Sequence, residues 1–397
     1  MEAVSNRIKA AAKSMERIHQ LYSFSRYSER RGDPGICDLT FGSPHEMPLP
    51  PFVEAIRRHA VPLNKDWFAY KQSEAEPQAF VAERLTRELS LPFEPEDVAL
   101  TNGASAAISV ALRLLLDIGD DAIFSTPAWF SYEPMPLIAD ATPRKVPLRT
   151  DSFDLDLDAI DAAITPLTRL VIVNTPHNPT GRIYSYEMLV ALAKVLDRAS
   201  ARIGRRIYLL SDEPYRRIRF DDHDFVSPAQ VYPWTVVTYS YAKVLLAPGD
   251  RLGYLAISPR MPWEERQAIQ NHMSTTQVAL GWCFPNAVMQ YAIPDLEELS
   301  IDMPALSANR NRMVETLEKA GYEVLRPEGT VYLFCKCPSN DPEEFWNALA
   351  ERDVFVIPGS TMGVPGHFRI CLTASKEMVE RSLPIFAETA EQMRNFR

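Results

Sequence analysis

The sequence lacks any long uninterrupted apolar run, and no segment approaches the roughly 18 apolar residues that a membrane-spanning helix needs. It also lacks a GxGxxG stretch and a P-loop, which disfavours nucleotide binding. Residues 1–31 are charged and contain no apolar core of a secretory signal. We therefore expect a soluble, cytoplasmic protein that does not bind a membrane.

An excess of positive charge is also absent. The formal net charge is -10 and the pI is about 5.4, with charges of both signs interspersed along the chain. This balance argues against nucleic acid or an anionic membrane as the main partner. The 397 residues are 46% hydrophobic, enough for two or three domains with cores of their own. Any basic groups that carry function should therefore lie in a local pocket.

Cysteine is scarce, and its spacing shows no motif of paired cysteines. The five cysteines are odd in number and scattered, and no CxxC occurs, which fits a reducing compartment. Cys335 and Cys337 alternate along a strand-like run, where a thiol pair or a metal site is one alternative. Because no histidine lies nearby, we favour buried free thiols and expect no metal.

What the sequence does contain is a repeated alternation of helical and strand-like segments. Short apolar runs occur between helical segments from about residue 51 onward, at 98–101, 121–126, 144–148, 169–175, 206–211 and 235–241. Nearly continuous apolar strands separated by helices indicate a largely parallel sheet that is covered on both faces. We predict an α/β fold whose large domain holds a mostly parallel, seven-stranded type of sheet between helices.

The pattern changes beyond about residue 260. Two long helical segments, 262–291 and 295–320, precede a shorter mixed section with strands and a terminal helix. We predict a smaller α/β domain formed by both ends of the chain. Residues 1–47 are expected to join it, 48–290 to form the large domain, and 291–397 to complete the small one.

One lysine stands in an unusual setting. Lys243 follows the apolar run 235–240, and a Pro-Gly turn and Arg251 come after it. A desolvated lysine can lose its proton and form a Schiff base with a carbonyl cofactor. Ser240 and Arg251 offer donors for an anionic phosphate. Taken alone, a lysine in a loop is usually a solvated surface charge, so the other loops must decide.

Further loops follow strand-like runs, where ligands of open α/β sheets bind. Gly103, Ala104 and Ser105 form a strand-to-helix turn whose backbone N–H groups suit a phosphate, although packing alone also explains such turns. In residues 174–182, Asn178 either aims its amide into a site or stabilises a tight turn. His177 lies in the same loop, and we favour a positioning role for it over that of a catalytic base.

Three other residues are candidates for a site. Asp212 closes an apolar strand with Tyr215 three residues on, and its carboxylate requires a cationic partner unless it caps the next helix. Trp129 offers a flat ring for stacking, or packs in the core. Arg369 lies inside an apolar strand, where it binds a substrate carboxylate or forms an internal salt bridge.

Together, in this order and spacing, these motifs resemble the fold type I pyridoxal 5'-phosphate (PLP) enzymes, specifically class I/II aminotransferases. The resemblance extends from about residue 35 to 390 and rests on NPTG, the Asp-x-x-Tyr pair and the lysine-to-arginine spacing. It implies that residues 48–290 bind PLP. It also implies that Lys243 forms the internal aldimine and shuttles a proton, and that Asp212 keeps the ring nitrogen protonated.

The resemblance implies further roles. Tyr215 and Asn178 would bond the ring hydroxyl, and Trp129 would stack on the ring. The phosphate would be held by Gly103, Ala104, Ser105, Ser240 and Arg251. Arg369, Asn178 and the backbone near Gly42 would bind the substrate α-carboxylate. Tyr70 matches a family tyrosine that reaches a phosphate in the neighbouring subunit, which implies a homodimer with shared sites.

Departures from the family pattern occur at Ala242, Ala75 and Asp250, and they put the subgroup and substrate in doubt rather than PLP binding. The leading hypothesis is amino transfer between an α-amino acid and a 2-oxo acid. A PLP-dependent lyase, decarboxylase, cyclase or oxidase is the alternative on the same fold. A non-catalytic regulatory protein is disfavoured by the intact Lys243 and Asp212. Side-chain specificity is expected to depend on loops around 43–47 and 274–277.

Overall fold

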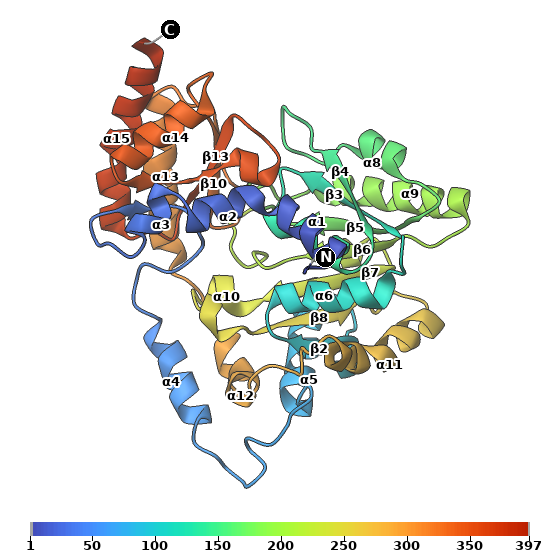
Figure 1. The fold of residues 1–397 in the computed structure, drawn as a ribbon. Helices are drawn as coiled ribbons and strands as arrows, with labels where there is room; N and C mark the ends of the chain where they lie inside the picture. Colours follow the sequence, from blue (N-terminus) through green and yellow to red (C-terminus); the bar gives the residue numbers. More distant parts are fainter. Residues whose placement is uncertain (1–2, 396–397) are drawn as a thin grey trace.

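The computed structural model describes residues 3–395 and shows a large and a small α/β unit in one chain (Figure 1). A seven-stranded sheet forms the centre of the large unit, in the order β2-β8-β7-β6-β5-β3-β4. The expected mostly parallel sheet is thus confirmed. Its strands are β2 (Val98–Thr101), β3 (Asp121–Thr126), β4 (Thr142–Pro147), β5 (Thr168–Asn174), β6 (Tyr208–Asp212), β7 (Thr235–Ser240) and β8 (Gly253–Ile257).

One strand of this sheet was not predicted. β8 pairs antiparallel with both β2 and β7, whereas the other neighbours in the sheet are parallel. It begins at a glycine directly after the Arg251 turn, and glycine is depleted in strands, so the segment resembles the end of a loop. All five of its residues are buried because it lies in the interior of the sheet.

Helices cover both faces of the sheet. On one face, apolar side chains of α6, α7 and α11 pack on the strands in a single core cluster. On the other face, α8 and α9 cover the β3–β6 part, and α4, α5 and α12 cover the part around β2 and β8. Their bounds are α4 (Pro50–His59), α5 (Ala75–Leu89), α6 (Ala104–Leu115), α7 (Pro134–Ile138), α8 (Leu157–Ala163), α9 (Tyr186–Ile203), α11 (Trp263–Ala279) and α12 (Ala287–Leu296).

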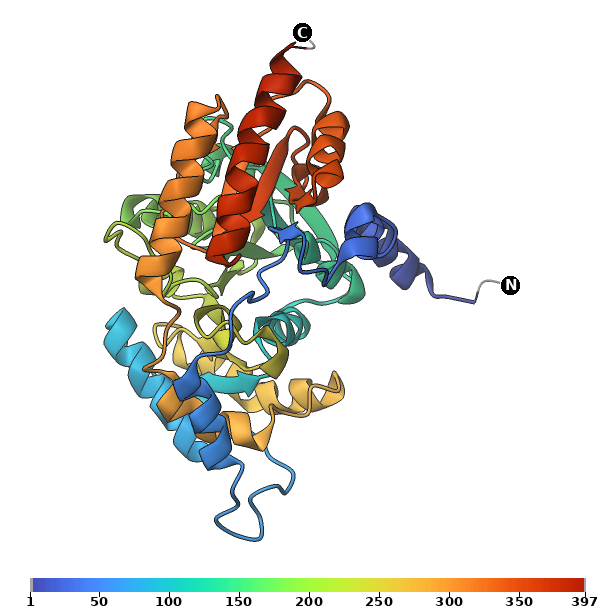
Figure 2. The same cartoon turned by 90° about the vertical axis from the view of Figure 1, so that its left-hand side faces the viewer.

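The small unit is built on a four-stranded antiparallel sheet in the order β12-β13-β10-β9. A separate parallel pair joins β1, from the N-terminal part, to β11, so both ends of the chain contribute as expected. The strands are β1 (Cys37–Asp38), β9 (Val324–Leu325), β10 (Tyr332–Lys336), β11 (Val354–Phe355), β12 (Ile357–Pro358) and β13 (His367–Cys371). The helices are α13 (Met303–Lys319), α14 (Pro342–Glu351) and α15 (Lys376–Asn395), and α13 and α15 pack side by side (Figure 2).

Two helical predictions need correction. The expected helix over residues 262–291 is two helices, α11 and α12, because Gly281 has φ +78° and Pro285 precedes the N-cap Asn286. The helix-like N-terminal segment is three short helices, which lie on one side of the molecule (Figure 2). These are α1 (Asn6–Ser14), α2 (Glu16–Ser23) and α3 (Arg26–Arg30). New caps at Met15 and Ser25 separate them.

α12 spans the expected domain boundary at residues 290 and 291. Met289, Ile293 and Leu296 of this helix pack in the cluster beneath β2 and β8. α12 therefore packs on the large unit along its length. The domain boundary at residues 290 and 291 stays a prediction. Within residues 3–395, no helix combines the length and apolarity needed to cross a membrane. The five thiols are free, and those at Cys335 and Cys337 are buried.

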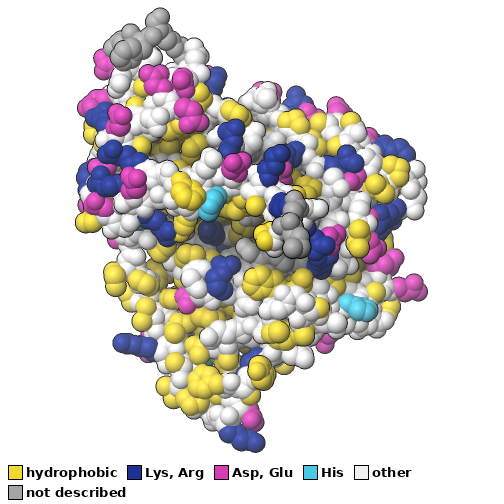
Figure 3. Space-filling view, in the orientation of Figure 1, with side chains coloured by type: hydrophobic (Ala, Val, Ile, Leu, Met, Phe, Trp, Pro, Cys, Tyr) yellow, Lys and Arg dark blue, Asp and Glu magenta, His cyan; other side chains and the backbone are white. Residues whose placement is uncertain are grey.

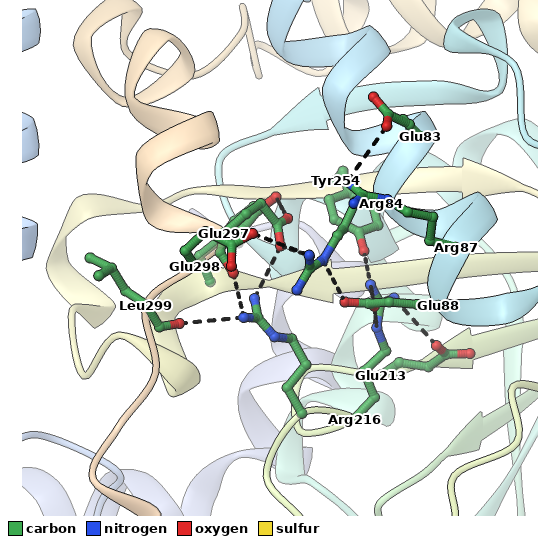
Figure 4. A network of polar contacts seen from close by, with 12 residues as sticks. Glu83, Arg84, Arg87, Glu88, Glu213, Arg216, Tyr254, Glu297, Glu298 and Leu299 are labelled. Carbon is green, nitrogen blue, oxygen red and sulfur yellow. Dashed lines mark hydrogen bonds and ion pairs between the residues drawn. The ribbon is translucent and has the colours of Figure 1, made fainter.

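A network of buried polar and charged side chains lies on the face of the sheet that α5 and α12 cover (Figure 4). It joins α5, β8, the segment after β6 and the end of α12. The guanidinium of Arg216, only 4% exposed, binds Glu88 at 2.9 Å and the Tyr254 hydroxyl at 2.6 Å. Arg217 binds Glu297 at 3.1 Å. Opposite charges buried this deeply depend on one another, because removing one leaves its partner without compensation.

We predict that Arg216→Met lowers the free energy of unfolding by about 3–5 kcal/mol, because the fully buried Glu213 carboxylate, 3.6 Å from Arg216, loses its cation. The matched control is Arg87→Met, whose side chain is 57% exposed and lies 3.6 Å from Glu83. It should change stability by less than about 0.5 kcal/mol. Chemical denaturation of both variants measures the difference, and equal effects would contradict a structural role for the buried pair.

Candidate active site

A cavity of about 240 Å³ opens where the carboxyl ends of β5, β6 and β7 meet the small unit. The front face of the molecule is hollowed in this region, between the two units and below the N-terminal helices (Figure 3). The expected site residues that line the cavity are Gly42, Ala104, Ser105, Trp129, Asn178, Asp212, Tyr215, Ser240, Lys243, Arg251 and Arg369. Segments far apart in sequence therefore converge on one space.

Lys243 projects from a one-turn helix, α10 (Tyr241–Val244), that begins directly after β7. The side chain of Ser240 caps this helix by accepting the Ala242 N–H at 3.3 Å. The backbone at Gly42 approaches so closely that a Cβ there would lie 3.0 Å from Lys243 Nζ and 2.7 Å from the Tyr332 hydroxyl. A side chain at this position would crowd the Tyr332 hydroxyl and force Lys243 to shift.

Asp212 ends β6 and is buried in the cavity wall. The Thr238 hydroxyl donates to Oδ1 at 2.9 Å, and the Tyr132 hydroxyl donates to Oδ2. Burial raises the pKa of Asp212 from 3.8 to about 6, although both hydroxyls and Lys243 act in the opposite direction. No Lys or Arg nitrogen of residues 3–395 lies within 4 Å of this carboxylate. The carboxylate is therefore ready to accept a cationic ligand.

Within residues 3–395, Arg369 of β13 is a buried cation without an anionic partner, whereas Asp212 is a buried anion without a cationic one. The Arg369 side chain is 2% exposed. Its guanidinium donates to Asn178 Oδ1 at 2.9 Å and to the Thr40 carbonyl at 3.0 Å, and it stacks on the Tyr332 ring at 3.9 Å. Nε has no partner, and no carboxylate among the described residues forms the salt bridge that was the competing interpretation. A buried guanidinium without an anion suits a carboxylate ligand.

A third part of the cavity suits a phosphate. Gly103 has φ +81° at the N-cap of the 12-residue helix α6, where a side chain would meet the Arg251 guanidinium at 2.7 Å. Arg251 is oriented by the carbonyls of Pro248 at 2.9 Å and Asn102 at 3.2 Å. The free N–H groups of the α6 N-terminus, with Ser105 and Ser240 beside them, complete an anion-binding corner.

The remaining cavity residues are mostly aromatic. Tyr215 is buried against Tyr332, with ring centroids 5.8 Å apart, and burial raises its pKa well above the ordinary value, so it keeps its proton. Trp129 is half-buried with its ring edge-on to Tyr132. The main-chain N–H of Asn178 donates to Asn174 Oδ1 at 2.7 Å, which holds the loop carrying the side chain.

Some candidates lie outside the cavity. His177 is buried, its Nδ1 is 2.8 Å from the Thr180 hydroxyl, and burial lowers its pKa to about 3. That environment matches the positioning role. Residues 274–277 belong to α11 and line no part of the cavity, whereas Ser43 does. Tyr70 is fully exposed in the long connection between α4 and α5.

Several residues in and around the cavity were not predicted from the sequence. Tyr132 and Thr238 orient the Asp212 carboxylate, and Tyr332 stacks on Arg369. Tyr132 lies three residues after Trp129, in the same loop, so its proximity to a site could have been inferred. Thr238 and Tyr332 lie within strands, and nothing in their local pattern distinguishes them from core residues.

Comparison with known proteins decides the family. The profile described as aminotransferase class I and II matches residues 35–384. The chain belongs to this family. It is similar to the aspartate/prephenate aminotransferase of Thermus thermophilus, 30% identical over 372 residues, covering 90% of this chain and 92% of the relative. It is also similar to the aspartate aminotransferase of Thermotoga maritima, 30% identical over 359 residues, covering 88% and 89%.

Solved structures of aminotransferases also superpose on this chain. An amino transferase from Eubacterium rectale superposes with a TM-score of 0.91 at 27% identity, covering 99% of this chain and 100% of that one. The Thermus thermophilus aspartate aminotransferase with maleate gives 0.81 at 26% identity, covering 98% and 100%. The resemblance seen in the sequence is confirmed, and this aminotransferase depends on PLP.

The cavity of the aminotransferase fits PLP on its own chemistry. The buried Asp212 carboxylate lacks a cation, which a pyridinium nitrogen would supply. The Gly103 turn and Arg251 offer donors to a phosphate group, and Lys243 offers the amine for a carbonyl. These three features lie in one cavity, as a cofactor with three functional ends requires.

We predict that Asp212→Asn stabilises the cofactor-free protein at neutral pH. The folded-state pKa of Asp212, about 6, exceeds the unfolded value of 3.8, so the wild-type protein loses stability as pH rises from about 4 to 6. The loss amounts to about 3 kcal/mol above that range, and the asparagine variant avoids it. Unfolding of both cofactor-free proteins between pH 4 and 8 measures the difference. A less stable variant at pH 8 would contradict this origin of the pKa.

Proposed function

We propose that amino transfer between an α-amino acid and a 2-oxo acid takes place in the cavity around Lys243. The observation that carries the proposal is a pair of isolated buried charges in one cavity. Asp212 has no cation and Arg369 has no anion among the described residues, and the amine of Lys243 shares their space. A cationic ring and an anionic amino acid complete both sites together.

PLP, when bound, supplies a carbonyl that condenses with amines and a ring that accepts the electrons of the α-carbon. Lys243 is the residue that carries the cofactor covalently. Its Nζ would also take the proton from the substrate α-carbon and deliver it to the cofactor carbon that carried the carbonyl, so one side chain would serve as base and acid. Gly42 lies next to this amine and has no side chain, since a Cβ there would lie 3.0 Å from Lys243 Nζ.

The other residues bind and orient. With PLP bound, Asp212 would hold the proton on the ring nitrogen, Tyr215 and Asn178 would donate to the ring hydroxyl oxygen, and Trp129 would cover the ring face. Arg369 fixes the substrate α-carboxylate together with Asn178 and the Gly42 backbone. The phosphate is held by Gly103, Ala104, Ser105, Ser240 and Arg251. The unpartnered Nε of Arg369 and the oriented guanidinium of Arg251 support these assignments.

We further propose a cytoplasmic homodimer in which Tyr70 reaches the phosphate of the neighbouring subunit. Tyr70 lies outside the cavity of its own chain and is fully exposed, although its ring is large and apolar. Phe68 beside it is also 58% exposed. An exposed aromatic pair on a long connection suits contact with a second copy.

Lys243→Ala should retain PLP without a covalent bond and convert it to pyridoxamine phosphate at least about 10²-fold more slowly, because it loses both base and acid. Single-turnover mixing with an amino acid, followed by absorbance and mass spectrometry, measures this change. Lys336→Ala, whose side chain is 51% exposed, is the control and should match the wild type. Release of ammonia without pyridoxamine phosphate in the wild type would indicate lyase chemistry instead.

Hybrid dimers test the shared site. Tyr70→Ala and Lys243→Ala homodimers should each be impaired, the first in PLP affinity and the second in turnover. Each hybrid regains one intact site, so an equal mixture after subunit exchange should recover about one quarter of the wild-type sites. Recovery that stays at the level of the unmixed variants would show that Tyr70 serves its own subunit or none.

A further inference from the structure

The side walls of the cavity are aromatic. Phe41 and Phe130 face it together with Trp129, and neither phenylalanine belongs to the groups assigned to cofactor or α-carboxylate. Both are half-buried; Phe41 lies in a bend after β1, and Phe130 begins a one-turn 3-10 helix, Phe130–Tyr132. Half-buried phenylalanines beside a ligand cavity are placed to gain contact area when a ligand arrives.

The cations of the cavity are already engaged. Among residues 3–395, those that line it are Lys243, Arg251 and Arg369, and the proposed function assigns each one to PLP or to the α-carboxylate. A second carboxylate on the substrate side chain would enter the aromatic part of the cavity, whose lining holds no further Lys or Arg among the described residues. Burying such a charge without a cation is strongly unfavourable, so a dicarboxylic substrate would need a cation from the neighbouring subunit of the proposed homodimer.

A groove of about 770 Å³ lies beside the aromatic part, along the N-terminal helices α1 and α2. Phe41 and Phe130 line both the cavity and the groove, so these two side chains lie between the two spaces. The other apolar side chains of the groove come from α1 and α2 and the residue between them, namely Ala12, Met15, Ile18 and Tyr22. The hollow face in Figure 3 has apolar side chains along its border.

The groove also has polar residues. Lys13, Glu16 and His19 lie on it, and all three are exposed to solvent. The lysine and the glutamate have opposite charges, so the groove offers no net field that favours an anionic side chain. Its wall is fixed on both sides, because Arg7 of α1 binds Asp140 at 2.6 Å and Ile18 packs with Ile357 and Met362 of the small unit.

We propose that the amino-acid substrate carries an apolar side chain of phenyl size or larger, which lies between Phe41 and Phe130 and extends toward this groove. The inference rests on the proposed function at Lys243 and names its substrate class. It separates this chain from an activity on aspartate, which is printed in the names of both relatives, whereas the name of the Thermus relative also prints prephenate. The aromatic pair, rather than a cation, selects the side chain.

The test is the single-turnover conversion of the PLP holoenzyme with L-phenylalanine, L-alanine and L-aspartate. Removing a phenyl-sized side chain from water is worth roughly 10- to 100-fold in affinity. L-Phenylalanine should therefore exceed both other amino acids at least about tenfold in rate per concentration. A faster reaction with L-aspartate would overturn the proposal, as would happen if a neighbouring subunit supplied a cation.

Variants locate the effect. Phe41→Ala and Phe130→Ala should each lower the rate per concentration for L-phenylalanine about tenfold and leave L-alanine unchanged. Met15→Glu, which places a charge on the groove wall, should act in the same direction. Tyr186→Ala removes a 55% exposed aromatic residue outside both spaces and should match the wild type. Equal losses for both amino acids would indicate a structural effect and contradict selection by the pair.

The two proposals fail differently. If no amino acid yields pyridoxamine phosphate, the proposed transamination itself is wrong. If L-aspartate reacts well and L-phenylalanine poorly, the transamination stands and only the substrate class is wrong.

Discussion

The burial of an uncompensated carboxylate at Asp212 is the constraint around which this structure is arranged. A charge of this kind is expensive in the interior, and its raised pKa expresses that cost. Hydroxyl donors from Tyr132 and Thr238 hold the carboxylate in one orientation without neutralising it. The rest of the fold must therefore be stable enough to maintain this destabilising group until a cation binds.

The buried charge network supplies rigidity next to the same residues. Glu213 follows Asp212, Arg216 follows Tyr215, and Tyr241 lies two residues before Lys243. Ser211 and Ser227 donate to Glu213 at 2.7 Å and 2.6 Å, and the Tyr241 hydroxyl donates to Glu297. Neighbouring side chains thus alternate between the cavity and the network. A displacement of either would strain hydrogen bonds in the other, which couples the position of the cavity residues to the core.

The sequence indicated the fold and most of the candidate cavity because parallel strands end at one edge, so residues after successive strands must converge. Lys243, Asp212 and Asn178 could be grouped in this way. Partners such as Thr238 and Tyr332 could not, because each lies inside a strand and its role depends on pairing register. The antiparallel β8 was missed for a related reason, since its glycine start conceals a strand that only the sheet interior explains.

Substrate selection follows different physical rules from cofactor binding. Asp212 is held at the end of β6 by the pairing of the central sheet, and Lys243 lies on the one-turn helix that begins directly after β7. Phe41 and Phe130 lie outside the sheets, in a bend and in a one-turn 3-10 helix, and the ring centroids of Phe41 and Tyr22 of α2 are 5.5 Å apart. Substitutions in the N-terminal helices can therefore reshape the aromatic space without disturbing the buried charges. For this reason, relatives with the same cofactor chemistry can differ in the side chain that they accept.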